Sequence, residues 1–110
     1  PLTLVLPQRK VPDYVSREGV AVRIPNHNIA LKIIEEVGPI TLTSANVHGG
    51  EEPATVDIAI QQLGDEVDIY MDCGKLGGRA STILDLRNGI RILREGPISM
   101  EEIMEVLDAP

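Results

Sequence analysis

Small polar side chains and two glycines follow an apolar run near the middle of the chain. Ile40–Thr43 leads into Ser44-Ala45-Asn46, and Gly49-Gly50 come shortly after. A strand that ends in short side chains lets a ligand approach backbone N–H groups, and hydroxyl and amide groups suit carboxylate, amide and phosphate oxygens. An ordinary turn at the end of a strand is the alternative. Ser44 and Asn46 are therefore candidate ligand contacts.

A second set of candidates lies further along the chain. Ser81 follows the glycine-rich loop Asp72–Arg79, whose backbone amides could cradle an anion. Arg94 ends a short apolar run, where a guanidinium can bind a phosphate through two parallel hydrogen bonds. The loop lacks the Gly-Lys-Ser/Thr sequence of a P-loop, so a flexible connection is its alternative. For Arg94 the alternative is a surface pair with Glu95.

Arg23 and His27 flank Pro25 at the end of another apolar run. Either side chain could face a substrate or only solvent, and a lone histidine is more often structural than catalytic. His48, Asp72 and Cys73 share no metal-ligand spacing, so no metal site is predicted. Sequence order alone supports no Ser-His-Asp triad, and no catalytic residue is assigned.

The elements that must position these residues alternate between strands and helices. Strands are predicted at Leu2–Leu6, Val20–Ile24, Ile40–Thr43 and Val67–Met71, and Ser81–Leu86 should pair antiparallel with Ile90–Leu93 through the Asn88-Gly89 turn. Helices are predicted over Ile29–Val37 with Asn28 as cap, over Val56–Leu63 with Thr55 as cap, and from a Ser99/Glu102 capping box to about Leu107. This order predicts an α/β fold with a mixed sheet.

Four ordered motifs resemble the YrdC-like family, the threonylcarbamoyl-AMP synthases of tRNA modification and related hydrogenase-maturation carbamoyltransferase domains. The motifs are Val20-Ala21-Val22-Arg23-Ile24-Pro25-Asn26-His27, Thr41–Gly50, Ser81-Thr82-Ile83-Leu84-Asp85 and Ile92–Ser99, after Pro1–Leu6 at the front. The resemblance implies a twisted mixed sheet with flanking helices. It also implies that residues 1–110 are the carboxyl-terminal portion of a single domain, and so an incomplete one.

The resemblance implies an enzyme that joins L-threonine, bicarbonate and ATP into threonylcarbamoyl-AMP and pyrophosphate, a nucleotidyltransferase reaction with Mg²⁺ on the phosphates. Ser44, Asn46, Ser81 and Arg94 would position the nucleotide and the acyl phosphate, and Arg23 would lie near the substrate. A carbamoyltransferase domain of the same family would need much the same residues. We expect the three binding positions near 44, 81 and 94 to converge on one cavity.

Several features depart from the family pattern. Asn28 stands where a proline commonly follows the histidine, and His48 interrupts the usual Ser-Gly after the asparagine. The basic Lys-x-Arg motif of the family's amino-terminal portion is absent from these residues. Those side chains are expected to hold the triphosphate and to neutralise charge as pyrophosphate leaves. The 110 residues alone are therefore expected to be inactive.

The alternative function is a non-catalytic module of the same fold that binds double-stranded RNA or tRNA, or associates with the ribosome. The net charge of −7 counts against it: residues 1–34 sum to +3, and residues 35–110 sum to −10. Only 2% of residues are aromatic, which argues against stacking on bases. A small basic island could hold one nucleotide's phosphates; it consists of Lys75, Arg79, Arg87, Arg91 and Arg94. Other tRNA-modification proteins are further candidate partners.

The cysteine count and the length of the apolar runs indicate the compartment in which we expect the protein. A single cysteine, Cys73, excludes an internal disulfide and fits a reducing compartment. No apolar run approaches the length of a membrane span, and no signal peptide is recognisable. We therefore expect a cytoplasmic protein with no membrane partner.

Overall fold

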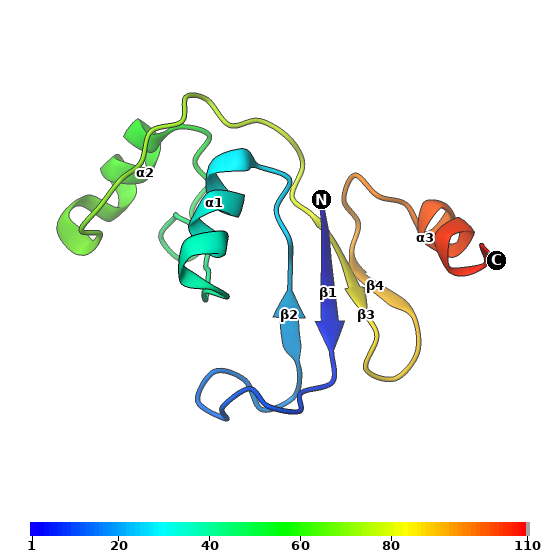
Figure 1. Ribbon diagram of the computed structural model, residues 1–110. Coiled ribbons are helices and arrows are strands. Elements are labelled where there is room, and N and C mark those ends of the chain that lie inside the picture. The colour runs from blue at the N-terminus through cyan, green and yellow to red at the C-terminus, as the bar shows by residue number, and fades with distance from the viewer. Residues whose placement is uncertain (110) are drawn as a thin grey trace. The chain divides into compact units, whose positions relative to one another are not determined.

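The computed structural model describes residues 1–109, and its internal contacts divide the chain into two units (Figure 1). Unit 1 consists of Pro1–Gly38 and the segment from Arg79 onward, and unit 2 is Pro39–Gly78. Unit 1 holds the sheet, and unit 2 holds helix α2 (Val56–Leu63) with a short 3₁₀ turn at Gly64–Glu66. Each unit is described by itself below.

The sheet of unit 1 is mixed and has the strand order β2-β1-β3-β4. Its strands are β1 (Leu2–Leu6), β2 (Val20–Val22), β3 (Thr82–Asp85) and β4 (Arg91–Arg94). β1 pairs parallel with β3 and antiparallel with β2, and β3 pairs antiparallel with β4. The arrows of β1 and β3 point the same way in Figure 1 and that of β2 points the opposite way. The predicted α/β fold with a mixed sheet is therefore confirmed.

The central strand β3 carries most of the buried residues of unit 1. Leu84 is buried, and so are three polar residues, Ser81, Thr82 and Asp85. The helix α3 (Met100–Leu107) adds Ile103 to this small core. Because β3 lies between β1 and β4, polar groups on it must find partners within the protein. Asp85 finds them in Arg87 and Arg91, and Thr82 finds them in the backbone of Ile98.

Helix ends follow the predicted capping residues at two of three helices. Thr55 caps α2 by accepting a hydrogen bond from Ile58 N, and Ser99 and Glu102 form the capping box of α3. The prediction that Asn28 caps the first helix is wrong, because α1 (Asn28–Val37) already begins at that residue. His27 is the N-cap of α1 and makes no side-chain capping bond. Gly38 ends α1 with a positive φ of 80°, a conformation that glycine adopts without strain.

Two predicted strands are not formed within the described residues. Ile40–Thr43 and Val67–Met71 have no strand conformation, and β2 ends at Val22 instead of Ile24. A strand needs a neighbouring backbone to satisfy its N–H and C=O groups, and unit 2 supplies no such neighbour to the first two segments. The pairing of β2 ends at Val22, close to Pro25, which has no N–H.

None of the helices within residues 1–109 is long and apolar enough to cross a membrane.

Candidate functional site

Ser81 and Arg94, two of the predicted site residues, are in direct contact. Arg94 Nε donates to the Ser81 carbonyl at 3.0 Å, and Arg94 Nη2 donates to Ser81 Oγ at 3.1 Å. Ser81 precedes β3 and Arg94 ends β4, so the hairpin pairing brings them together. Arg94 is exposed while Ser81 is buried. The guanidinium is therefore fixed along one side by Ser81, and the Arg94 side chain is otherwise exposed.

Thr3 completes this cluster, and the sequence reasoning missed it. Thr3 Oγ1 and Ser81 Oγ form a hydrogen bond at 2.8 Å, in which either hydroxyl can be the donor. The contact joins residues 78 positions apart in sequence, and it depends on the parallel pairing of β1 with β3, in which Thr3 lies opposite Ile83. The available signal was a single hydroxyl inside the apolar run Leu2–Leu6. We refer to Thr3, Ser81 and Arg94 as the Ser81 cluster.

The backbone beside Ser81 is tightly packed. Thr82 Oγ1 donates to the Ile98 carbonyl at 2.7 Å and accepts from Ile98 N at 3.1 Å, and Thr82 N donates to the Pro1 carbonyl at 3.0 Å. A Cβ placed on Gly96 would lie 2.3 Å from Thr82 N and 2.6 Å from the Ser81 carbonyl carbon. Only glycine fits at position 96 without moving the backbone that presents Ser81.

Arg23 lines an open hollow of about 460 Å³ on unit 1. The other lining residues are Pro1, Leu2, Leu4, Val22 and Ile24. If the β1–β2 register, which pairs Leu4 with Val22, continued by one residue, Arg23 would lie opposite Thr3. Arg23 is exposed, and its place in this hollow puts a cation beside the strand that carries Thr3. The predicted role of Arg23 near the substrate stays a prediction.

Ser44 and Asn46 belong to unit 2. Ser44 is exposed, and Asn46 Nδ2 donates to the carbonyls of Val47 and Gly50 at 3.1 and 3.0 Å. These two bonds fix the orientation of the amide, because the reversed amide would turn its oxygen toward two carbonyls. Asn46 Oδ1 is then buried with no hydrogen-bond partner within residues 1–109. That Ser44 and Asn46 share a cavity with the Ser81 cluster stays a prediction.

The basic island is only partly free to bind phosphate. Asp85 accepts from Arg87 Nε and Nη2, both at 2.9 Å, and from Arg91 Nη2 at 3.4 Å. Hydrogen bonds from the Arg87 side chain and backbone hold the pKa of Asp85 well below its usual range. Arg87 and Arg91 are thus committed to a carboxylate that joins the two strands of the hairpin. Asp85, the only acidic residue in the sequence between Lys75 and Arg94, therefore pairs with two of the five cations of the island.

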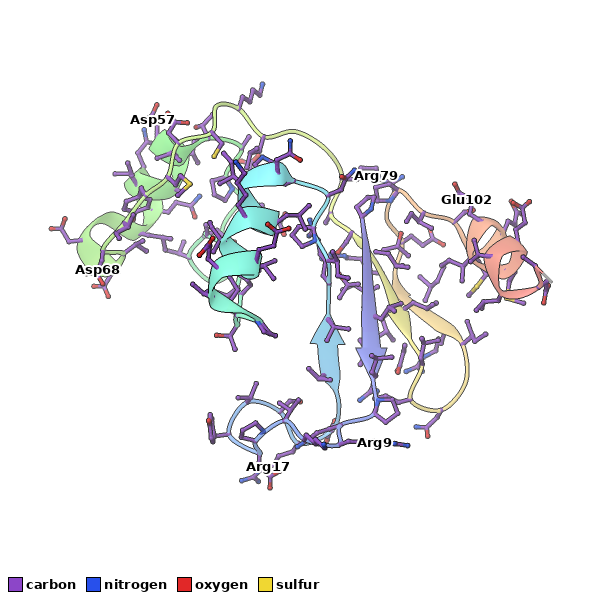
Figure 2. All side chains as sticks on the ribbon, viewed as in Figure 1. Arg9, Arg17, Asp57, Asp68, Arg79 and Glu102 are labelled. Carbon is purple, nitrogen blue, oxygen red and sulfur yellow. The ribbon has the colours of Figure 1, made fainter. Side chains whose placement is uncertain are left out.

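Arg79 lies at the end of the unit 1 sheet where β3 begins, whereas Arg9 and Arg17 lie at the opposite end (Figure 2). Ser81 follows Arg79 by two residues, so the Ser81 cluster is at the Arg79 end. In the part of the chain that the structure describes, no three His, Cys, Asp or Glu side chains gather closely enough to hold a metal ion.

A family model described as "Telomere recombination" and named for Sua5, YciO and YrdC matches residues 1–96. The chain belongs to the Sua5/YciO/YrdC family. This confirms the resemblance drawn from the four sequence motifs. The match extends over β1 to β4 and includes all five predicted site residues, Arg23, Ser44, Asn46, Ser81 and Arg94.

Several members of the Sua5/YciO/YrdC family are similar to this chain. A Mycobacterium tuberculosis protein, provisionally named threonylcarbamoyl-AMP synthase, is 44% identical over 90 residues, which are 80% of this chain and 42% of that protein. The threonylcarbamoyl-AMP synthase of Pyrococcus abyssi is 38% identical over 113 residues, 97% of this chain and 33% of that protein. The chain thus spans less than half the length of these relatives.

A crystal structure of P. abyssi Sua5 complexed with L-threonine has the same fold. The TM-score is 0.86 at 36% sequence identity, and the match covers 97% of this chain and 33% of that one. The α/β fold with a mixed sheet is therefore that of part of Sua5. Which portion of the family's domain the chain represents stays a prediction.

Proposed function

We propose that the protein carrying these residues is an L-threonylcarbamoyladenylate synthase acting in tRNA threonylcarbamoyladenosine modification. Its substrates would be L-threonine, bicarbonate and ATP, and its products threonylcarbamoyl-AMP, pyrophosphate and water. The observation that carries the proposal is the match over 97% of this chain to P. abyssi Sua5, whose structure holds L-threonine. The names of the relatives favour this enzyme over an RNA-binding module. A cytoplasmic location stays a prediction.

The Ser81 cluster supports binding of an anionic group in that reaction. Two nitrogens of Arg94 are engaged by Ser81, and Arg94 Nη1 makes no hydrogen bond within residues 1–109. A guanidinium held in this way can donate to a phosphate or carboxylate oxygen with little further loss of side-chain entropy. Ser81 Oγ offers a hydroxyl beside it. Arg94 would therefore bind the anion, and Thr3 would position Ser81.

Asn46 supports a second contact with the substrate. Its Oδ1 is a buried acceptor without a donor within the described residues, and such atoms are costly unless a ligand or water satisfies them. An N–H or O–H group of ATP or L-threonine would supply the missing donor. Ser44, two residues earlier and exposed, would offer a hydroxyl to the same ligand. On unit 1, Arg23 would lie near the substrate, as the family resemblance implies.

The proposed chemistry needs alignment more than a protein nucleophile. The amine of L-threonine forms a bond to the carbon of bicarbonate, and water leaves to give threonine carbamate. An oxygen of this carbamate attacks the α-phosphorus of ATP, a new O–P bond forms, and the bond from the α-phosphorus to the bridging oxygen breaks as pyrophosphate leaves. Cationic donors such as Arg94 would stabilise the negative charge that the phosphate oxygens gain. Positioning the two substrates would lower the entropic cost of their meeting. Mg²⁺ stays an expectation of the family resemblance, and no step here is assigned to it.

The test is pyrophosphate release by the intact protein with ATP, L-threonine and bicarbonate. Arg94→Ala removes charged hydrogen bonds, so kcat/KM should fall about 10- to 100-fold. Arg9→Ala is the matched control, because Arg9 is an exposed arginine at the other end of the sheet (Figure 2), and its kcat/KM should be unchanged. Wild-type protein that releases no pyrophosphate when all three substrates are present would refute the proposal.

A further inference from the structure

Gln62 joins helix α2 to the loop that carries Asn46. Gln62 Oε1 accepts from Val47 N at 3.1 Å, and Gln62 Nε2 donates to the Glu51 carbonyl at 2.9 Å. One half-buried side chain therefore holds the loop at two points. We call Asn46–Glu51 the Asn46 loop. Within residues 1–109, Gln62 is the only residue outside the Asn46 loop that forms a hydrogen bond with it.

The Asn46 loop has room for the Gln62 amide because Gly50 lacks a side chain. A Cβ at Gly50 would lie 2.9 Å from Gln62 Oε1 and 3.0 Å from the Val47 carbonyl oxygen. Gly50 N donates to that carbonyl at 2.8 Å, so the loop closes on itself where Gln62 reaches it. Gln62 extends from a regular element, since α2 is capped by Thr55 at its start. The helix thus gives the loop a fixed point of attachment.

The loop that Gln62 holds in turn fixes the Asn46 amide. Asn46 Nδ2 donates to the carbonyls of Val47 and Gly50 at 3.1 and 3.0 Å, which uses both of its hydrogens. Asn46 therefore offers a ligand only Oδ1, the buried acceptor without a partner within the described residues. Val47 connects the two side chains, because its N–H binds Gln62 and its carbonyl accepts from Asn46. Loss of the Gln62 bonds would release Val47 and allow the Asn46 amide to turn.

We propose that Gln62 is a positioning residue, which orients Asn46 so that Oδ1 accepts from an N–H or O–H group of the substrate. Gln62 itself touches no ligand in this scheme and acts only through Val47 and Asn46. The inference rests on the proposed function, because it takes Asn46 as a substrate contact. In a purely structural role, Gln62 would stabilise the Asn46 loop without affecting substrate binding.

Gln62→Met and Gln61→Met form a matched pair of variants of the intact protein. Methionine has nearly the helix propensity of glutamine, and Gln61 is an exposed neighbour on α2 that forms neither bond to the loop. Asn46→Ala identifies the substrate that Asn46 contacts, ATP or L-threonine, by a raised KM. Gln62→Met should raise the same KM about 5- to 20-fold and leave kcat within about twofold of the wild type, whereas Gln61→Met should change neither.

A double-mutant cycle of Gln62→Met with Asn46→Ala tests whether Gln62 acts through Asn46. In the Asn46→Ala protein, Gln62→Met should raise that KM by less than about twofold, because no amide is left to orient. If Gln62→Met does not fold, Gln62→Glu replaces it in the cycle, since it removes only the donor to Glu51. Independent, additive effects of the two substitutions would overturn the proposal, and so would equal KM values for Gln62→Met and Gln61→Met.

A second measurement does not depend on activity. In amide NMR spectra of the isotope-labelled intact protein, the side-chain NH2 resonances of Asn46, assigned through Asn46→Ala, should shift in Gln62→Met and stay in place in Gln61→Met. That result in a protein that releases no pyrophosphate would count against the proposed function alone. Unshifted Asn46 resonances in Gln62→Met would overturn the positioning role even in an active synthase.

Discussion

Ser81 Oγ has two partners in this chain, Thr3 Oγ1 at 2.8 Å and Arg94 Nη2 at 3.1 Å. Thr3→Val keeps the shape of the side chain and removes the hydroxyl, so Ser81 loses one of the bonds that fix its rotamer. A net hydrogen bond contributes about 1 kcal/mol, and we expect KM for the substrate that Ser81 contacts to rise about 2- to 10-fold with a smaller change in kcat. Steady-state kinetics with ATP and L-threonine varied separately would measure this.

Thr3→Ser is the conservative comparison, because serine keeps the hydroxyl and loses only a methyl group. Its KM values should stay close to those of the wild type. If Thr3→Val and Thr3→Ser gave the same kinetics, Thr3 would have only a packing role in β1. The test thereby separates positioning of Ser81 from a general effect on the sheet.

Gly96 has no room for a side chain, because a Cβ there would lie 2.5 Å from the Ala80 carbonyl oxygen and 2.3 Å from Thr82 N. Both atoms belong to the backbone and cannot rotate away, so Gly96→Ala must displace the strand that presents Ser81. Overpacking of this kind costs about 1–3 kcal/mol in the free energy of unfolding. Urea denaturation of the intact protein would report the loss as a lower midpoint.

Gly77→Ala is the matched control for Gly96→Ala. A Cβ at Gly77 meets nothing within 4 Å, and the Gly77 φ does not lie in the left-handed region. Its midpoint should equal the wild-type value or exceed it slightly, because alanine narrows the unfolded ensemble. Equal midpoints for the two variants would mean that the backbone around Ser81 yields easily.

At the scale of elements, the β3–β4 hairpin depends on an ionised Asp85. The Arg87 hydrogen bonds lower the pKa of Asp85 in the folded protein, so the carboxylate stabilises the fold above its unfolded pKa of about 3.9. That stability is lost progressively as the pH falls below about 4 toward the folded pKa. The free energy of unfolding, measured from pH 6 downward, should therefore decline with falling pH. For Asp85→Asn the free energy of unfolding should decline less steeply.

The Ser99 hydrogen bonds also lower the pKa of Glu102 in the capping box of α3, so this carboxylate contributes to the same acid dependence. Glu102→Gln removes that contribution and leaves the hairpin intact. Figure 2 shows Glu102 on α3, away from the strands.

A pH profile of Asp85→Asn that matched the wild type would show that the ion pairs with Arg87 and Arg91 do not stabilise the hairpin.

Elements with local signals could be predicted from the sequence, and elements that need distant partners could not. The helix Val56–Leu63 was predicted with its Thr55 cap because that signal lies directly before the first turn. The segment Ile40–Thr43 has a strand pattern but no strand neighbour in unit 2. Ser81 and Arg94 were singled out through their motifs, and the structure brings them into contact, while their role in a site stays a prediction. Thr3 was missed because only the β1–β3 pairing brings it to Ser81.

At the scale of the whole molecule, the charge distribution separates the enzymatic interpretation from the RNA-binding one. The chain carries a net charge of −7, and Asp85 forms ion pairs with two arginines of the basic island, Arg87 and Arg91. Binding to a duplex requires several free cations that displace counterions from phosphates. We therefore expect no shift of a double-stranded RNA by the 110-residue chain at about 10 µM and physiological salt in a gel assay, where nonspecific binders typically have a Kd of about 10⁻⁴ to 10⁻⁶ M.

Asp85→Asn provides the internal comparison for the RNA assay, because it removes one negative charge and releases Arg87 and Arg91 from their carboxylate. If Asp85 were the only group that keeps the basic island from binding RNA phosphates, this variant would bind RNA measurably at low salt. It would lose that binding as the salt concentration is raised. Tight, salt-resistant binding by the wild-type chain would instead support the non-catalytic module. In the absence of such binding, any contact with tRNA would have to come from polypeptide beyond these 110 residues, because the acidic charge of residues 35–110 repels phosphate.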